Sequence, residues 1–341
     1  MTRCAYSRPR RRAPDPRRRT LVAALAGSAM GWGRAYAAAG EAAFPSRTVR
    51  IVVPYSVGVG PDVVARSVGE RLAARWNQPV VVDNKPGASG IVAFTEVRQV
   101  PADGHTLFLA DTATLVVNPL LHASLPYDPV RDLVPLSLLF HATFVLWVGG
   151  SSRFRSASAL LDAARRTPDG VSYASLGNGH ASQLAIETLA RAAGVRMLHV
   201  PFRDAGALFS AVAAGDVDFT AFSVNTVAGL MTSGRLRPLA VAAKTRLPAH
   251  PEIPTLAEAG APPVEMHPWA AMVAPAATPA TTVAQLQRDI VAALDTAEVR
   301  GRADQAGFDI TPSTPDAVRD RMRSDRALYA PLISEGRIAA V

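Results

Sequence analysis

Short apolar runs alternate with amphipathic helical stretches along most of this chain, and this alternation constrains its fold more than any other feature. Residues 49 to 53 form one apolar run, after which Val64, Val68 and Leu72 recur every four residues and share one helix face. The alternation resumes between residues 156 and 242. Because a helix must cross the sheet between two parallel strands, the pattern predicts an α/β fold whose strands are parallel and covered on both faces.

The individual elements follow from the same periodicity and from helix-capping residues. Gly194 and Gly215 end two expected helices, where a residue without Cβ adopts the left-handed conformation easily, and Thr314 caps a third. We expect helices at residues 156–166, 182–193, 205–214 and 282–297 and from Pro315 onward. We expect strands at residues 49–53, 80–82, 106–110, 171–175, 197–200, 217–222 and 236–242.

Length and hydropathy bound the architecture further. About 300 residues follow the N-terminal segment, which is more than a single hydrophobic core usually organises, so two lobes are expected. The most apolar run, residues 133–148, is interrupted by Pro135, Ser137 and His141. We therefore interpret it as buried strands and not as a membrane span.

The first 40 residues differ in composition from the rest of the chain. They contain nine arginines against one acidic residue, Asp15. The arginine cluster is followed by an apolar stretch too short to span a bilayer, residues 20–26, and by small residues at 35–39. This layout predicts a cleaved signal peptide at residues 1–40 and a periplasmic mature chain beginning near Phe44. Arg18 and Arg19 also fit a twin-arginine signal, so either export route is open, and a basic tail on a cytosolic protein is the disfavoured alternative.

The same segment accounts for the net charge of +8. The remaining residues hold 27 basic side chains (36 less nine) and 27 acidic ones (28 less one). These residues therefore carry no net charge that would attract nucleic acid phosphates, and no nucleic acid partner is expected. The one cysteine, Cys4, also lies in this segment, and the mature chain is expected to have neither a disulfide nor a cysteine nucleophile.

Two glycine-containing segments, residues 54–62 and 175–182, each connect an expected strand to an expected helix. Free N–H groups at a helix start and the positive end of the helix dipole form a site for an anion, and glycine lets a ligand approach the backbone. We therefore predict that the two segments bind a small carboxylate, with tight turns as the alternative role of the glycines. The candidate ligand-binding residues in these segments are Tyr55, Ser56, Val57, Gly58, Val59, Gly60, Asp62, Ser175, Gly177, Asn178, Gly179 and His180.

Three residues outside the two segments complete the candidate site, namely Phe202, Arg203 and Asn225. Arg203 is able to pair with a ligand carboxylate, with a solvated surface arginine as the alternative. Asp204 is interpreted as a helix N-cap rather than a catalyst. The histidines other than His180 are scattered without the spacing of metal ligands, and no metal site is expected.

Nucleotide binding is the main competing interpretation, because Gly58 and Gly60 follow a strand and Asp83 follows the next one. Val63 at the third glycine position and Pro61, which lacks an amide where a phosphate would bind, argue against it. The sequence contains no Gly-x-Ser-x-Gly elbow, His-Glu-x-x-His pair or Walker loop, so neither enzymatic activity nor a cofactor is expected. A secreted enzyme using the same site is an alternative that turnover assays would reveal.

A series of short motifs runs from Phe44 to Gly260, and AP at 274–275 and TP at 278–279 follow it. The motifs of the series are FPSR at 44–47, VVPY at 52–55, VVDNKPGA at 81–88, DGHTL at 103–107, LPYDP at 125–129, YAS at 173–175, HVPF at 199–202 and PTLAEAG at 254–260. With these motifs in this order, the sequence resembles the Bug family, the substrate-binding proteins of tripartite tricarboxylate transporters.

The resemblance implies a type II periplasmic-binding-protein fold, with two α/β lobes around a hinged cleft. Residues 44–140 with 267–341 would form one lobe, and residues 141–266 the other. It also implies a carboxylate held by backbone amides and waters and delivered to integral membrane transporter subunits, or alternatively a ligand sensor that acts on a signalling receptor. A monomer is expected. Val59, Pro61 and His180 depart from the family's usual residues and leave the identity of the ligand open.

Overall fold

The computed structural model describes residues 44–340. Residues 47–341 make up one compact unit, and of the separate N-terminal unit, residues 1–46, only residues 44–46 are described. The predicted signal peptide at residues 1–40 lies outside the described residues.

The first of two sheets has six strands. These are β1 (Val49–Val53), β2 (Val80–Asn84), β3 (Thr106–Asp111), β4 (Leu133–His141), β10 (Trp269–Pro275) and β11 (Asp309–Ile310). Their order is β11-β4-β10-β3-β1-β2. The pairs formed by β1 with β2 and β3 are parallel, and the pairs formed by β10 and β11 are antiparallel.

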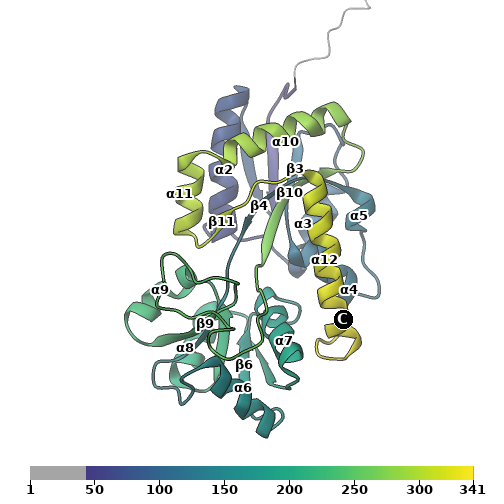
Figure 1. Cartoon of the computed structure of the whole chain (residues 1–341). Coiled ribbons are helices and arrows are strands. Elements are labelled where there is room, and N and C mark those ends of the chain that lie inside the picture. The colour runs from purple at the N-terminus through teal and green to yellow at the C-terminus, as the bar shows by residue number, and fades with distance from the viewer. Residues whose placement is uncertain (1–43, 341) are drawn as a thin grey trace, which may run out of the picture. The chain divides into compact units, whose positions relative to one another are not determined.

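The second sheet has five strands in the order β7-β6-β8-β5-β9. Strands β6 and β9 of this sheet are labelled in the lower part of Figure 1. These are β5 (Val145–Gly149), β6 (Ser172–Ser175), β7 (Leu198–Pro201), β8 (Phe219–Phe222) and β9 (Leu236–Val241). Strand β6 pairs in parallel with β7 and β8, whereas β5 pairs antiparallel with β8 and β9. We refer to each sheet and the helices packed on it as the first and the second lobe.

The α/β class is confirmed, but the prediction of wholly parallel sheets is wrong. The chain passes from β4 directly to β5 through residues 142–144, and it returns from β9 to β10 through residues 242–268. A parallel neighbour requires a crossover within its own sheet. Strands that join one sheet to the other have no such crossover, and their direction is free to oppose that of their neighbours.

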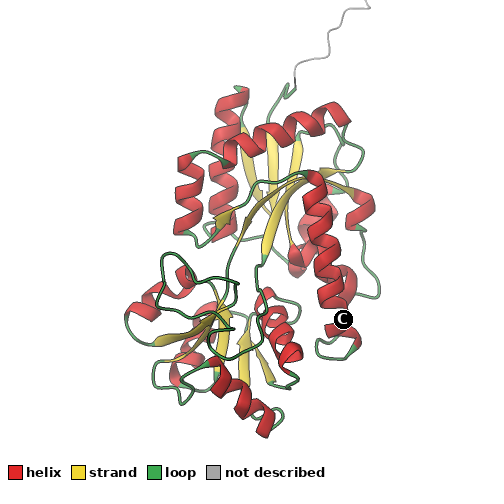
Figure 2. Ribbon diagram, viewed as in Figure 1, coloured by secondary structure: helices red, strands yellow, loops and turns green. Residues whose placement is uncertain are grey.

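Helices flank both sheets (Figure 2). In the first lobe they are α2 (Gly60–Trp76), η1 (Ala88–Gly90), α3 (Ile91–Val97), η2 (Ala113–Val117), α4 (Asn118–Leu121), α5 (Pro129–Asp132), α10 (Ala280–Leu294), α11 (Ala297–Gln305) and α12 (Pro315–Ser334). In the second lobe they are α6 (Ala157–Arg166), α7 (Ala181–Ala193), α8 (Ala205–Ala214) and α9 (Val224–Thr232).

The capping predictions are confirmed. Gly194 and Gly215 end α7 and α8 in the left-handed conformation. Thr314 accepts a hydrogen bond from the amide of Ala317, and Asp204 accepts one from Ala207. The helix expected at 282–297 instead ends at Leu294, because Thr296 caps a separate helix, α11.

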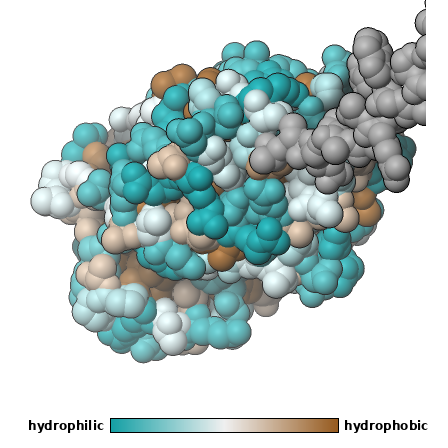
Figure 3. Space-filling view, turned by 90° about the horizontal axis from the view of Figure 1, so that it is seen from above, coloured by the Kyte–Doolittle hydropathy of each residue, from teal (hydrophilic) through white to brown (hydrophobic). Residues whose placement is uncertain are grey.

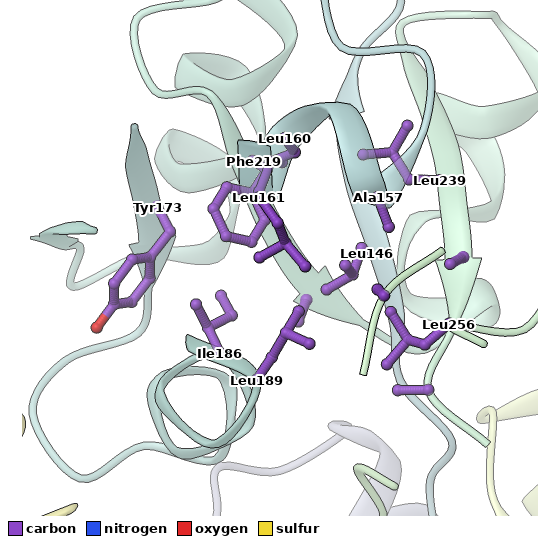
Figure 4. Packing of buried hydrophobic residues seen from close by; sticks show 14 of the residues in the cluster. Leu146, Ala157, Leu160, Leu161, Tyr173, Ile186, Leu189, Phe219, Leu239 and Leu256 are labelled. Carbon is purple, nitrogen blue, oxygen red and sulfur yellow. The ribbon is translucent and has the colours of Figure 1, made fainter. Parts of the chain in front are cut away.

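Each lobe has its own apolar core. In the second lobe, Leu146 and Phe219 from the sheet lie beside Leu161 of α6 and beside Ile186 and Leu189 of α7 (Figure 4). All five are fully buried, and burying a side chain of this kind contributes about 1.5–3 kcal/mol.

The exterior is mainly hydrophilic in the view of Figure 3, where apolar residues appear singly or in small groups. None of the helices between residues 44 and 340 is long and apolar enough to cross a membrane. The run at 133–148 forms β4 and β5, as its interruptions predict.

Candidate functional site

The two glycine-containing segments occupy equivalent places in the two lobes. The first loop, residues 54–60, connects β1 to α2, and the second loop, residues 175–180, connects β6 to α7. Both therefore lie at the carboxyl ends of strands and at the beginning of a helix. Open α/β sheets bind ligands at this edge.

A glycine in each loop is tied to a side chain four residues later. The amide of Gly58 donates to Asp62 Oδ2 at 2.8 Å, and the amide of Gly179 donates to Gln183 Oε1 at 2.7 Å. Both glycines have positive φ, 84° and 74°. The glycines therefore shape the loops, and their amides are already paired within the chain.

Asp62 anchors the first loop from inside the protein. Only 1% of its surface is exposed, and besides Gly58 it accepts hydrogen bonds from Arg66 Nε at 3.0 Å and Asn84 Nδ2 at 2.7 Å. Burial opposes ionisation of this carboxyl, but the hydrogen bonds from Arg66, Gly58 and Asn84 outweigh burial and lower its pKa. The structure thus places Asp62 as a support of the loop, with little capacity left for a ligand.

The loops differ in the amides that they leave unpaired. Within the second loop, Gly177 donates to Ser175 Oγ at 3.1 Å, and His180 donates to the Gly177 carbonyl at 3.2 Å. In the first loop, the amides of Val57, Val59 and Gly60 have no partner among the described residues. The expectation of unpaired donors therefore agrees with the structure at Val57, Val59 and Gly60, and it fails for Gly58 in the first loop and for Gly177, Gly179 and His180 in the second.

His180 supplies a side-chain donor in the second loop instead. Its Nδ1 accepts a hydrogen bond from the amide of Ser182 at 3.1 Å, which assigns the ring proton to Nε2. Loss of water around the half-buried ring lowers its pKa to about 4, although the charge of Asp111 acts in the opposite direction. His180 is therefore neutral at pH 7 and presents an Nε2–H donor.

Tyr55 is held by Asp111 at the end of β3. The phenol donates to Asp111 Oδ2 at 2.5 Å, while Asp111 Oδ1 accepts from the amide of Thr114 at 2.8 Å and from its hydroxyl at 2.9 Å. Burial, together with the charge of Asp111, raises the pKa of Tyr55 well above its ordinary value. The sequence interpretation missed Asp111, whose signal is an acidic residue directly after the apolar run of β3.

The second loop meets η2 and α4 of the first lobe. A Cβ atom on Gly179 would lie 2.5 Å from Leu121 Cδ1 and 3.4 Å from Val117 Cγ1. Thr112 and Ala181 line one small cavity of about 10 Å³, which is space for roughly one water. Asp111 and Thr112 of the first lobe thus lie close to His180 and Ala181 of the second.

The remaining predicted residues lie apart from this point. Phe202 donates its amide to the Ser175 carbonyl at 2.8 Å and packs on the core. Asn225 at the start of α9 donates to the Asp304 carbonyl of α11, which makes it a contact between lobes. Ser56 and Arg203 are exposed, and Arg203 has no partner among the described residues.

Two larger cavities lie elsewhere in the described chain. One of about 500 Å³ lies beside α12 and α5, and one of about 440 Å³ lies near Glu187 and Arg337. Neither is lined by residues of the two loops. Within residues 44–340, no group of three His, Cys, Asp or Glu side chains is arranged to hold a metal ion.

Two mixed sheets, each with a glycine-containing loop at the carboxyl ends of its strands, are typical of periplasmic binding proteins, and solved structures of this class match the chain. R. palustris Rpa4515 with adipate matches with a TM-score of 0.76 and 28% identity, over 87% of this chain and 100% of that one. MatC from Rhodopseudomonas palustris with bound malate matches with a TM-score of 0.72 and 28% identity, over 85% of this chain and 99% of that one.

Sequence comparison defines the family more narrowly. The chain is 37% identical over 299 residues to a protein in the tcbD-tcbE intergenic region of Pseudomonas sp. (strain P51), covering 87% of this chain and 89% of that protein. Residues 64–326 match the model of the tripartite tricarboxylate transporter family receptor. The chain belongs to this receptor family, which confirms the resemblance seen in the motifs. The family is one of binding proteins, as expected for a chain that is not an enzyme.

Proposed function

We propose that this protein is exported to the periplasm, captures a small carboxylate between the first and second loops, and delivers it as a monomer to the membrane subunits of a tripartite transporter. The observation that carries the proposal is that Asp111, which holds Tyr55 of the first loop, lies close to His180 of the second loop, while amides at the start of α2 are unpaired among the described residues. Relatives of 28% identity bind adipate and malate, which supports the ligand class.

The available donors are sufficient for micromolar affinity. In this proposal the amides of Val57, Val59 and Gly60 bind one carboxylate group, and each charge-assisted hydrogen bond contributes about 1.5–3 kcal/mol. The dipole of α2 adds about 0.3–2 kcal/mol. Micromolar binding requires roughly 8 kcal/mol, so three amides with the dipole reach it without a buried arginine.

Asp111 determines which chemical group of the ligand can lie next to it. Its oxygens accept three hydrogen bonds, from the Tyr55 hydroxyl, the Thr114 amide and the Thr114 hydroxyl, which leaves capacity for one more donor. A second ligand carboxylate next to Asp111 would be repelled, whereas a ligand hydroxyl or ammonium group would be accepted. In this proposal malate and aspartate bind more tightly than succinate.

The predicted lobe boundaries become part of the same proposal. Residues 44–140 with 267–341 would move against residues 141–266 about the two connections at 142–144 and 266–268. Closure removes water from the ligand and strengthens each hydrogen bond to it.

The test removes the amide of one residue of the first loop. Val59 has φ of −78°, which proline adopts, and its amide has no partner among the described residues. Val59→Pro should weaken malate binding about tenfold or more in calorimetry, while the control Val59→Ala, which keeps the amide, should bind like wild type. Equal affinities of the two variants, or no stabilisation of the wild type by malate, aspartate, succinate, adipate or citrate in thermal denaturation, would contradict the proposal.

A further inference from the structure

The cavity of about 500 Å³ in the first lobe has an apolar floor. Leu115, Val116, Tyr127, Leu133 and Met322 line it, and each is at most 9% exposed. Its volume falls within the range of about 300–1,000 Å³ that is typical of small-molecule sites. An apolar body placed in it would be removed from water on several sides.

Arginines of α12 surround the opening. Arg319, Met322, Arg323 and Arg326 all line the cavity, and their spacing of three, four and seven residues places them on one helix face. Arg319 pairs with Asp316 at 2.6 Å, and Arg323 pairs with Asp320. Arg326 has no partner among the residues that the structure describes.

One guanidinium group of the lining has no acidic partner in the described part of the chain. Asp128 is the one acidic residue in the lining, and its carboxylate already accepts hydrogen bonds from the amides of Val130 and Arg131 as the cap of α5. Asp316 and Asp320 already pair with Arg319 and Arg323, so Arg326 is the guanidinium of the lining that is left to bind an anion.

We propose that this cavity is a second ligand site, which binds an amphipathic carboxylate with its apolar body on Val116 and Met322 and its head group on Arg326. A guanidinium presents a planar pair of donors that matches a carboxylate. The lining shares no residue with the first or second loop, so this site is independent of the proposed transport function.

Octanoate is the probe, titrated into the full chain by calorimetry and followed by backbone amide NMR. Wild type should bind octanoate with shifts at Leu115, Val116 and Val130, and the neutral probe octanol should bind at least about tenfold more weakly. Arg326→Gln should weaken octanoate binding to a similar extent. The matched control is Arg288→Gln, an exposed arginine of α10 that has no partner among the described residues and should have no effect.

Val59→Pro separates the two proposals, because octanoate binding should persist in it even where malate binding is lost. Loss of octanoate binding in Val59→Pro would place the probe at the first loop and overturn the second site alone. Equal effects of Arg326→Gln and Arg288→Gln, equal binding of octanol, or no octanoate binding up to millimolar concentration would also overturn it. Shifts at the cavity that follow protein concentration instead of octanoate would assign it to a second copy of the chain.

Discussion

The first and second loops use the same local device and present different chemistry. Each has a left-handed glycine whose amide is closed by the side chain four residues later, Asp62 in the first loop and Gln183 in the second. The first loop leaves backbone amides at its exposed tip without partners. In the second loop the amides of Gly177, Gly179 and His180 are paired within the chain, and the His180 side chain supplies a donor. Similar glycine patterns therefore specify the shape of a loop but not the groups that it offers to a ligand.

The anchors also differ in charge and in the number of partners. Asp62 connects Gly58, Arg66 and Asn84, whereas Gln183 accepts from Gly179 and contacts His199 Nδ1 at 3.2 Å. The charged anchor holds residues from three segments of the first lobe. We therefore expect the first loop to depend more strongly on its anchor than the second.

Removal of the two anchors, Asp62 and Gln183, should produce the largest difference in stability between the two loops. Asp62→Ala leaves the amide of Asn84 and the guanidinium of Arg66 without a buried acceptor, which should lower the free energy of unfolding by about 3–4 kcal/mol. Gln183→Ala leaves one neutral amide unpaired and should cost about 1–2 kcal/mol. Urea denaturation at pH 7 measures both values.

The variant Asp62→Asn is the control for the charge. It keeps the shape of the anchor, so a loss close to that of Asp62→Ala would assign the effect to the carboxylate charge. Equal losses for Asp62→Ala and Gln183→Ala would contradict the difference drawn between the two loops.

Substitution of the two loop glycines, Gly58 and Gly179, should produce the second-largest difference in stability between the loops. A Cβ on Gly58 meets no atom within 4 Å, whereas a Cβ on Gly179 meets Leu121 Cδ1 of the first lobe at 2.5 Å. Gly58→Ala should therefore cost only the left-handed strain of roughly 1–2 kcal/mol. Gly179→Ala adds the clash, for a total of about 2–3 kcal/mol, and Leu121→Ala in the same chain should recover the clash term. A double mutant whose loss is the plain sum of the two single losses would show that the lobes do not meet at Gly179.

Local sequence was sufficient for features that depend on neighbouring residues. The strand-to-helix position of both loops and the caps at Asp204, Gly194 and Thr314 were predicted, because periodicity and capping act within a few residues. The connection from β4 to β5 was not, since antiparallel pairing of joining strands is set by the arrangement of the two sheets.

Distant residues at the candidate site were also missed. Asp111 meets Tyr55 across 56 positions, and Leu121 meets Gly179 across a similar separation. Such contacts leave no periodic signal. Gln183 could have been found from the sequence. Asp62 follows Gly58 by four residues and Gln183 follows Gly179 by four residues, so interpreting Asp62 as the anchor of its loop identifies Gln183 as the equivalent residue.

Acidification should affect the second loop through His180, with the smallest of the expected effects. The folded-state pKa of about 4 lies below the ordinary value of 6.5, so between these values the unfolded chain binds more protons. Stability contributed by the neutral ring is therefore complete above pH 6.5 and is lost as the pH falls toward 4.

His180→Asn keeps a cap acceptor for the Ser182 amide but does not titrate. Between pH 7 and pH 5, wild type should lose about 1–2 kcal/mol more unfolding free energy than His180→Asn, measured by urea denaturation. Parallel losses in both proteins would mean that the ring is already hydrated in the folded state, and the assignment of a neutral Nε2–H donor to the second loop would then be wrong.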